Sequence, residues 1–227
     1  MAKCSNPTCT SSTLASVDTE NAGLGWFSSI AIGTDGNPVI SYLDSINETL
    51  KVAVCDDPAC ESATVRTLGA SSPVGSFVSA SILIGTDGNP VISYFFNPGD
   101  SHTQIDVGTL NVAACNDPSC SSVTITVLDS SGVTGQSNAI TLDTNGLPAI
   151  SYYDRTNEDL KLARCSNASC TSAELSVVDS TGRVGGWRNS IASLPDGRLV
   201  IAYMDETNYC CEPLVNQPLK VAVIPAE

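Results

Sequence analysis

The stretch Ser29-Ile-Ala-Ile-Gly-Thr-Asp-Gly-Asn-Pro-Val-Ile-Ser-Tyr42 decides the fold, because versions of it occur four times along the chain. It returns at 81–94 with a single change, Leu83 in place of alanine, and in more divergent form at 139–152 and 190–203. The pair Asp35-Gly36 predicts a hairpin turn between two short apolar strands, since glycine adopts a positive φ without steric cost. A recurring hairpin of this kind is typical of a repeat architecture.

Each hairpin, with strands A and B, is followed by a third predicted strand, C, at 50–55, 110–115, 160–165 and 219–224. Three copies then add a fourth strand, D, after a cysteine loop, at 63–68, 123–128 and 174–178. One unit is therefore a four-stranded antiparallel meander of about 50 residues, the size of one β-propeller blade.

The last copy ends without strand D, whereas residues 13–18 near the N-terminus match that strand. We predict an all-β, single-domain protein over 1–227, a four-bladed β-propeller whose N-terminal strand completes the last blade and leaves no exposed edge. A rival arrangement passes this strand to a neighbouring molecule and gives an oligomer. The predicted blades span about 28–68, 79–128, 138–178, and 189–224 together with 13–18.

Ten cysteines indicate the compartment. Eight form C-x4-C pairs inside polar loops, and the other two are adjacent, which is typical of a disulfide framework kept under oxidising conditions. We expect an extracellular or periplasmic protein whose export signal has been removed. The pairs lie in separate repeats, so we expect no zinc site. The predicted disulfides join Cys4 to Cys9, Cys55 to Cys60, Cys115 to Cys120 and Cys165 to Cys170, and we favour a bond between Cys210 and Cys211 over free thiols or a link to another chain.

Charge excludes two classes of partner. The chain carries 10 basic and 24 acidic residues, a formal net charge of −14. Nucleic acids and anionic membranes require clusters of lysine and arginine, so neither is an expected partner. No apolar run approaches the roughly 20 residues that span a bilayer, and we expect no membrane insertion.

The repeats Asp35-Gly-Asn-Pro-Val-Ile-Ser-Tyr42 and Leu50-Lys-Val-Ala-Val-Cys55 resemble those of secreted microbial β-propeller repeat proteins. The chain is also distantly similar to sialidase-like and fucose-lectin propellers. The resemblance covers nearly the whole chain and implies the scaffold alone, because the sialidase Asp-box is absent and no site residue carries over.

One face of the predicted propeller carries the longest loops, those from B to C and the crossings from D to the next A. Variable loops on a rigid scaffold are where binding residues concentrate. Insertions follow strand B in the second and fourth copies, at 97–109 and 206–218. We predict ligand contacts from Trp26, Phe77, Tyr153, Trp187, Tyr209, His102 and Asp205. Alternatively, Trp26 and Trp187 have a structural role and fill gaps between blades. His102 is then a solvent-exposed loop residue without a ligand.

Two series of aspartates recur. The first, Asp44, Asp154 and Asp205, ends strand B, and a lysine opens each matching strand C; the second copy has Phe96 and Asn111 instead. Loss of both partners together favours exposed cross-strand ion pairs over a calcium site. The second series opens the D-to-A crossings, where aspartate commonly bonds its own backbone; its members are Asp18, Asp129 and Asp179.

We therefore predict a non-catalytic extracellular binding module for carbohydrate or a cell-surface glycoconjugate, with no cofactor, metal or catalytic residue. A surface protein as partner and a homo-oligomer are further expectations. One alternative is a structural subunit of an extracellular filament or surface assembly. Another is a glycoside hydrolase, which needs paired carboxylates; the spacing selects no pair among Asp100, Asp106, Asp205 and Glu206.

Overall fold

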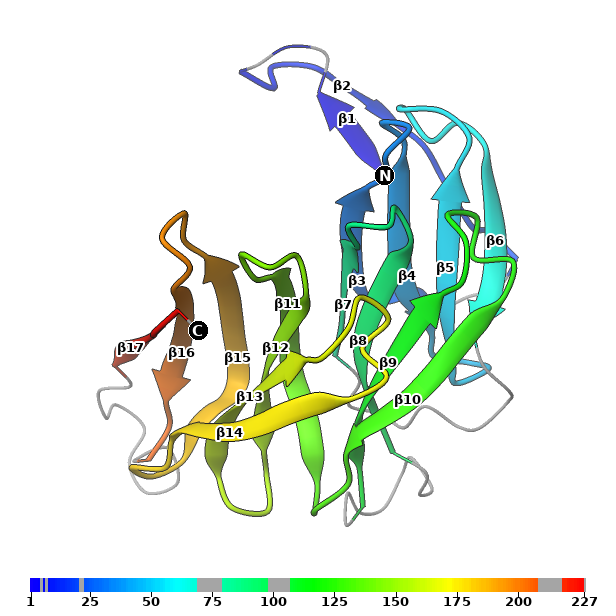
Figure 1. Ribbon diagram of the computed structural model, residues 1–227. Coiled ribbons are helices and arrows are strands. Elements are labelled where there is room, and N and C mark those ends of the chain that lie inside the picture. The colour runs from blue at the N-terminus through cyan, green and yellow to red at the C-terminus, as the bar shows by residue number, and fades with distance from the viewer. Residues whose placement is uncertain are drawn as a thin grey trace.

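The computed structural model describes residues 1–4, 6, 8–20, 23–68, 79–97, 107–207 and 218–226, apart from the side chains of residues 186 and 187. All regular structure in this part of the chain is β (Figure 1). No helix among these residues could cross a membrane.

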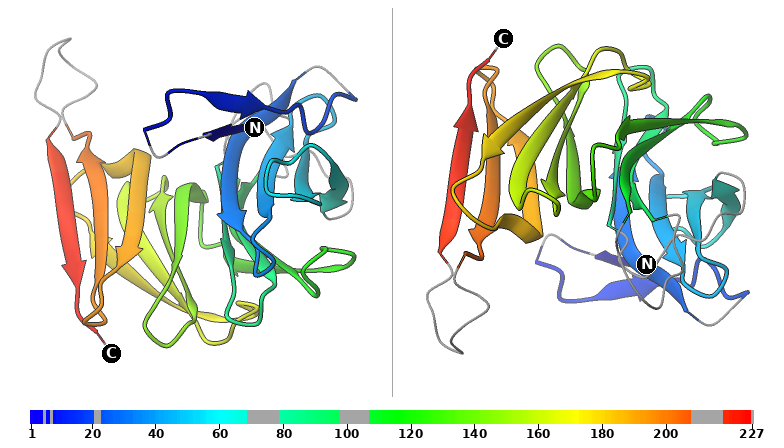
Figure 2. Two further views of the ribbon diagram at one scale, coloured as in Figure 1. Left: turned by 90° about the horizontal axis from the view of Figure 1, so that it is seen from above. Right: turned by 90° about the horizontal axis from the view of Figure 1, so that it is seen from below.

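The repeats form the predicted antiparallel sheets, which confirms the meander unit. Seen from above, the sheets follow one another around an arc (Figure 2). Their strands are as follows: sheet 1 contains β3 (Leu24–Ile32), β4 (Pro38–Asp44), β5 (Thr49–Cys55) and β6 (Ala63–Leu68); sheet 2 contains β7 (Ala80–Ile84), β8 (Pro90–Phe96), β9 (Thr109–Cys115) and β10 (Val123–Asp129); sheet 3 contains β11 (Thr134–Leu142), β12 (Pro148–Asp154), β13 (Asp159–Cys165) and β14 (Ala173–Asp179); and sheet 4 contains β15 (Val184–Ser193), β16 (Leu199–Asp205) and β17 (Leu219–Ile224).

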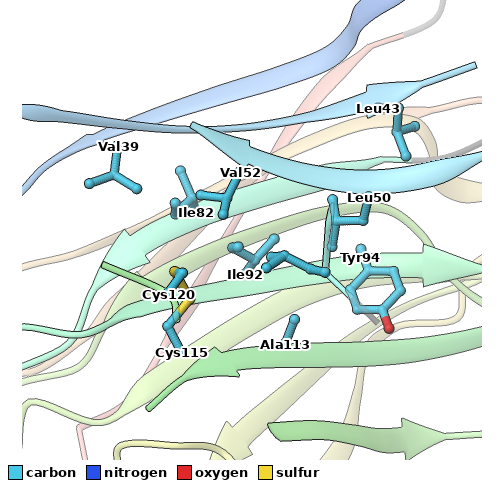
Figure 3. Packing of buried hydrophobic residues seen from close by; sticks show 11 residues of the cluster. Val39, Leu43, Leu50, Val52, Ile82, Ile92, Tyr94, Ala113, Cys115 and Cys120 are labelled. Carbon is cyan, nitrogen blue, oxygen red and sulfur yellow. A yellow bond between two sulfur atoms is a disulfide. The ribbon is translucent and has the colours of Figure 1, made fainter. Parts of the chain in front are cut away.

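The core lies between successive sheets. Leu50 and Val52 of β5 belong to one buried cluster with Ile82 and Ile92 of sheet 2 (Figure 3). The same positions of strand C meet the next sheet again between sheets 2 and 3 and between sheets 3 and 4. Each sheet therefore presents an outgoing apolar face on strand C and an incoming one on strands A and B.

Polar side chains also join the sheets. The Ser93 hydroxyl of sheet 2 donates to Asn138 of sheet 3 at 2.7 Å, and the Ser151 hydroxyl of sheet 3 donates to Asn189 of sheet 4 at 2.6 Å. Between sheets 1 and 2 the asparagine position is occupied by Ala80, and the hydroxyl of Ser41 is buried without a hydrogen-bond partner. The first junction therefore lacks this bridge.

The two ends of the chain differ from the expected closed ring. Strand β2 (Ser12–Leu14) pairs with β1 (Ala2–Cys4) and not with β17, so in the described residues sheet 4 has three strands. The reason is local: β1, the cysteine loop and β2 form a hairpin in which Cys4 faces Ser12, the same register as the hairpin between β5 and β6. A short local hairpin costs less loop entropy than a pairing between chain ends.

All four loop disulfides are present as predicted, each with a Cα–Cα distance of 4.8 or 4.9 Å. The second cysteine of each loop has a positive φ between 48° and 55°, which turns the chain back into strand D. Cys210 and Cys211 lie outside the described residues.

Candidate functional site

The recurrent aspartates lie where one sheet meets the next, at the end of the molecule that carries the long loops. At the junction of sheets 2 and 3, Asp129 accepts hydrogen bonds from the Lys161 ammonium at 2.6 Å and the Tyr152 hydroxyl at 2.8 Å. Lys161 also lies 3.6 Å from Asp154, the aspartate that ends strand B of its own sheet. One lysine thus links the aspartates of two neighbouring sheets.

This arrangement, which we call the junction clamp, occurs at two further places. Asp179 of sheet 3 meets Tyr203 and Lys220 of sheet 4 at 2.7 and 3.3 Å. Asp18, which follows β2, meets Tyr42 and Lys51 of sheet 1 at 2.6 and 2.9 Å. The clamp therefore joins three pairs of consecutive segments in the same way.

The clamps explain both aspartate series. The predicted ion pairs within a sheet are confirmed, at 3.8 Å for Asp44 and 2.9 Å for Asp205, but the pair at Asp44 is buried and not exposed as expected. The predicted turn bonds are also confirmed, since Asp129 accepts from its own turn at the Ser131 amide. The sequence did not reveal that the other carboxylate oxygen reaches into the next sheet.

Electrostatics keep the clamp aspartates ionised. Burial opposes ionisation of Asp129, but hydrogen bonds from Lys161, Ser131 and Tyr152 outweigh it and lower its pKa. The same balance, with Thr181, Tyr203 and Lys220 as donors, lowers the pKa of Asp179 to about 2. Groups fixed in the anionic form and neutralised by lysine suit structural roles better than proton transfer. No three metal-ligating side chains gather in a site within the described ranges.

A different carboxylate has no counterpart in the other sheets. Glu206 directly follows β16, and its side chain is 0% exposed. The Nε of Arg183, in the crossing that leads to β15, lies 3.4 Å from the Glu206 carboxylate, and the Glu206 amide donates to the Arg183 carbonyl at 2.8 Å. The equivalent positions carry Ser45, Asn97 and Arg155.

Tyr153 of β12 lies against this pair. Burial raises the pKa of Tyr153, the carboxylates of Glu158 and Glu206 add to the rise, and Arg183 acts in the opposite direction. The tyrosine is buried, while the Arg183 side chain is 37% exposed and connects the cluster to solvent. Tyr153 was a predicted ligand residue, and Arg183 was missed because a single arginine in a crossing has no repeat to identify it.

The other predicted ligand residues that the structure describes do not belong to the Glu206 cluster. Trp26 is 57% exposed on β3, with its ring 6.2 Å from that of Phe27, so within the described residues it does not fill a gap between sheets. Asp205 is held by Thr207 and Lys220. Phe77, His102 and Tyr209 lie outside the described residues, as does the side chain of Trp187.

One large cavity, of about 820 Å³, lies between the N-terminal segment and sheet 1. It is lined by residues 15–19 on one side and by Leu24, Ile30, Ile40 and Tyr42 on the other. These residues form the incoming face of sheet 1. In sheets 2, 3 and 4 the equivalent face is covered by the preceding sheet. The cavity therefore does not coincide with the Glu206 cluster.

The sequence matches no protein-family model and no curated protein. Solved structures share the fold, which is that of a β-propeller. An α-L-arabinofuranosidase from Lactobacillus brevis aligns with a TM-score of 0.56 at 12% identity over 88% of this chain and 67% of its own. An endo-arabinanase from Bacillus licheniformis gives 0.51 at 14% over 91% and 73%, and a Hadza microbial sialidase gives 0.59 at 11% over 88% and 43%.

These comparisons correct one expectation. We expected a protein that is not an enzyme, whereas the three structures named above, which share its fold, carry the names of glycosidases. That expectation is wrong, because this fold is one that carbohydrate-cleaving enzymes use. Identities of 11–14% establish the fold and assign no substrate to this chain.

Proposed function

We propose that the protein is an extracellular carbohydrate-active enzyme that hydrolyses glycosidic bonds, with Glu206 as a catalytic carboxylate. The observation that carries the proposal is the fully buried Glu206 side chain beside Arg183 and Tyr153, at the loop-bearing end of sheets 3 and 4. Burying a charged side chain is costly, and a perturbed cluster without a repeat counterpart is a candidate site.

The chemistry assigns roles to the cluster. Arg183 forms an ion pair with Glu206, in which its Nε lies 3.4 Å from the carboxylate. A buried anionic carboxylate beneath the sugar-binding surface stabilises the positive charge that develops on the sugar ring. The partly exposed Arg183 can also bind sugar hydroxyls, and Asp205 is the nearest second carboxylate along the chain.

Two further features support a carbohydrate substrate outside the cell. The exposed Trp26 and Phe27 offer ring faces on which the C–H face of a sugar can stack. Four disulfides persist in oxidising compartments, where polysaccharides and surface glycoconjugates are found. The acidic surface favours a neutral or weakly charged glycan over a polyanion.

The experiment compares wild-type protein with Glu206→Gln on arabinan, an aryl arabinofuranoside and a sialoside, measuring released sugar. We expect Glu206→Gln to lower kcat by about 100-fold or more, the range for a lost catalytic carboxylate. Glu174→Gln, at an exposed glutamate on β14 of sheet 3, is the matched control and should leave kcat unchanged. Equal rates for wild type and Glu206→Gln, with both folded, would move catalysis elsewhere, and calorimetric binding without release by wild type would refute hydrolysis.

A second candidate function is a structural subunit of an extracellular surface assembly. One observation favours it: strand β17 presents an apolar face and an unpaired edge within the described part of the chain. Such an edge is a template for pairing with another chain.

A further inference from the structure

The outgoing face of sheet 4 is exposed at two positions, those of Leu219 and Val221, that are buried in every other sheet. On β17, Leu219 is 76%, Val221 58% and Val223 50% exposed. The equivalent residues of sheet 3, Leu160 and Leu162, are 0% and 1% exposed because sheet 4 covers them. The residues of β17 thus have the chemistry of a sheet junction, and no sheet in the described part of the chain covers them.

The incoming face of sheet 1 shows the complementary exposure. Ile30 of β3 is 53% exposed, whereas its equivalents Ile82, Ile140 and Ile191 are 6%, 9% and 9% exposed. Ile32 on the same strand is 58% exposed. The molecule therefore carries both halves of one more junction, one half at each end of the arc.

The N-terminal segment already occupies the place of a preceding strand D. Asp18 clamps Tyr42 and Lys51 of sheet 1 just as Asp179, at the end of β14, clamps Tyr203 and Lys220 of sheet 4. Residues 12–17 therefore lie where the strand D of a sheet preceding sheet 1 belongs. In the described residues, β1 stands in the place of strand C of that sheet, over three paired residues.

We propose that two copies of the chain associate head to tail, with β17 of one copy displacing β1 and pairing with residues 12–17 of the next. The register follows from the pairing of β5 with β6, in which Leu50 faces Leu68 and Val54 faces Thr64. It places Leu219 opposite Val17 and Val223 opposite Thr13. The apolar face of β17 then covers Ile30 and Ile32 of the partner.

The occupant is a second copy because sheet 4 is fixed within its own chain. It is clamped to sheet 3 through Asp179 and bridged through Asn189, and β17 lies on its outer side, away from β2 (Figure 2). Association of two copies leaves these contacts in place and breaks only the short pairing of β1 with β2. Such a contact is heterologous and builds a ring or a filament.

Cross-linking of two singly substituted chains tests the proposal. A chain with Thr13→Cys is mixed with a differently tagged chain with Val223→Cys under mild oxidation. We expect a cross-linked species containing both tags, and none when either variant is incubated alone. If the mixture gives no such species, the proposal is wrong. In a chain that carries both substitutions, a disulfide formed within a monomer would show that the ring closes within one chain instead.

A surface variant provides a second test by light scattering. Val221→Lys should weaken association at least tenfold while the melting temperature of the isolated chain stays unchanged. The matched control is Val177→Lys on β14, a valine that is 54% exposed on a face outside the proposed contact, and it should associate like wild type. A wild-type protein that keeps the mass of one chain at all concentrations tested, or equal effects of both variants, would overturn the proposal.

Discussion

Removing one clamp aspartate should reveal how much the junctions contribute to stability. We consider Asp129→Ala, because the Asp129 side chain is 2% exposed and Lys161 is 12% exposed. Breaking a buried ion pair by removing one partner costs about 3–5 kcal/mol. Asp154 remains 3.6 Å from the lysine, so we expect the lower end, about 3 kcal/mol.

The measurement is the free energy of unfolding from urea denaturation, supported by thermal melting. A loss of about 3 kcal/mol corresponds to a fall in Tm of about 6–12 °C for a chain of this size. Sheet 2 offers a natural control, since its sequence has Phe96 and Asn111 in place of the aspartate and lysine of the clamp, and Gly69 in place of the preceding aspartate. Grafting that solution, as Asp129→Gly with Asp154→Phe and Lys161→Asn, should cost less than Asp129→Ala because no buried charge is left unpaired. A loss below about 1 kcal/mol for Asp129→Ala would refute a buried clamp, since that is the range of exposed pairs.

Four more outcomes are expected. Non-reducing mass spectrometry should find the four loop disulfides, and reduction should lower stability by about 2 kcal/mol for each short loop; free thiols in native protein would contradict the assignment. The folded pKa of Asp179, about 2, lies below its unfolded value. The Asp179 carboxylate therefore stabilises the fold above about pH 4, and this stabilisation is lost as pH falls towards 2. The difference in free energy of unfolding between wild type and Asp179→Asn should close over that range, and a constant difference would contradict an ionised Asp179 in the clamp. Gly135→Ala should be far more damaging than Gly36→Ala, because a Cβ at Gly135 would lie 2.6 Å from the Leu110 Cα while one at Gly36 meets nothing within 4 Å; both have positive φ, so equal losses would leave only backbone strain. Ala80→Asn should raise stability by about 1 kcal/mol by giving the Ser41 hydroxyl a partner, and a loss would show that β7 cannot hold the bridge.

The repeat made most of the fold predictable. Strand boundaries followed from Asp-Gly turns, from proline at the first residue of strand B and from the cysteine loops, all of which act within a few residues. Pairing between the chain ends was not predictable in the same way. The sequence at 13–18 matches strand D, but it does not show whether the partner of this segment is β1, β17 or the β17 of another copy.

The candidate site was less predictable for a related reason. Glu206 was visible as one of several acids in the loops, and only the structure separates it from Asp205 by its burial and its contact with Arg183. Tyr153 was predicted from its place after strand B, but its ring is buried beside Arg183 and Glu206 and is not available for stacking. Contacts between sheets depend on the arc, which no local pattern encodes.

The uneven junctions give the molecule a built-in order of disassembly. Sheets 2, 3 and 4 are joined by clamps and asparagine bridges, whereas sheets 1 and 2 are held together mainly by the apolar cluster around Val52 and Ile92. In an array where each unit touches only its neighbours, the weakest contact sets where the array divides. Under denaturant or pulling force, sheet 1 with its N-terminal hairpin should detach first, leaving the other three sheets as one cooperative body that retains Glu206 and its neighbours.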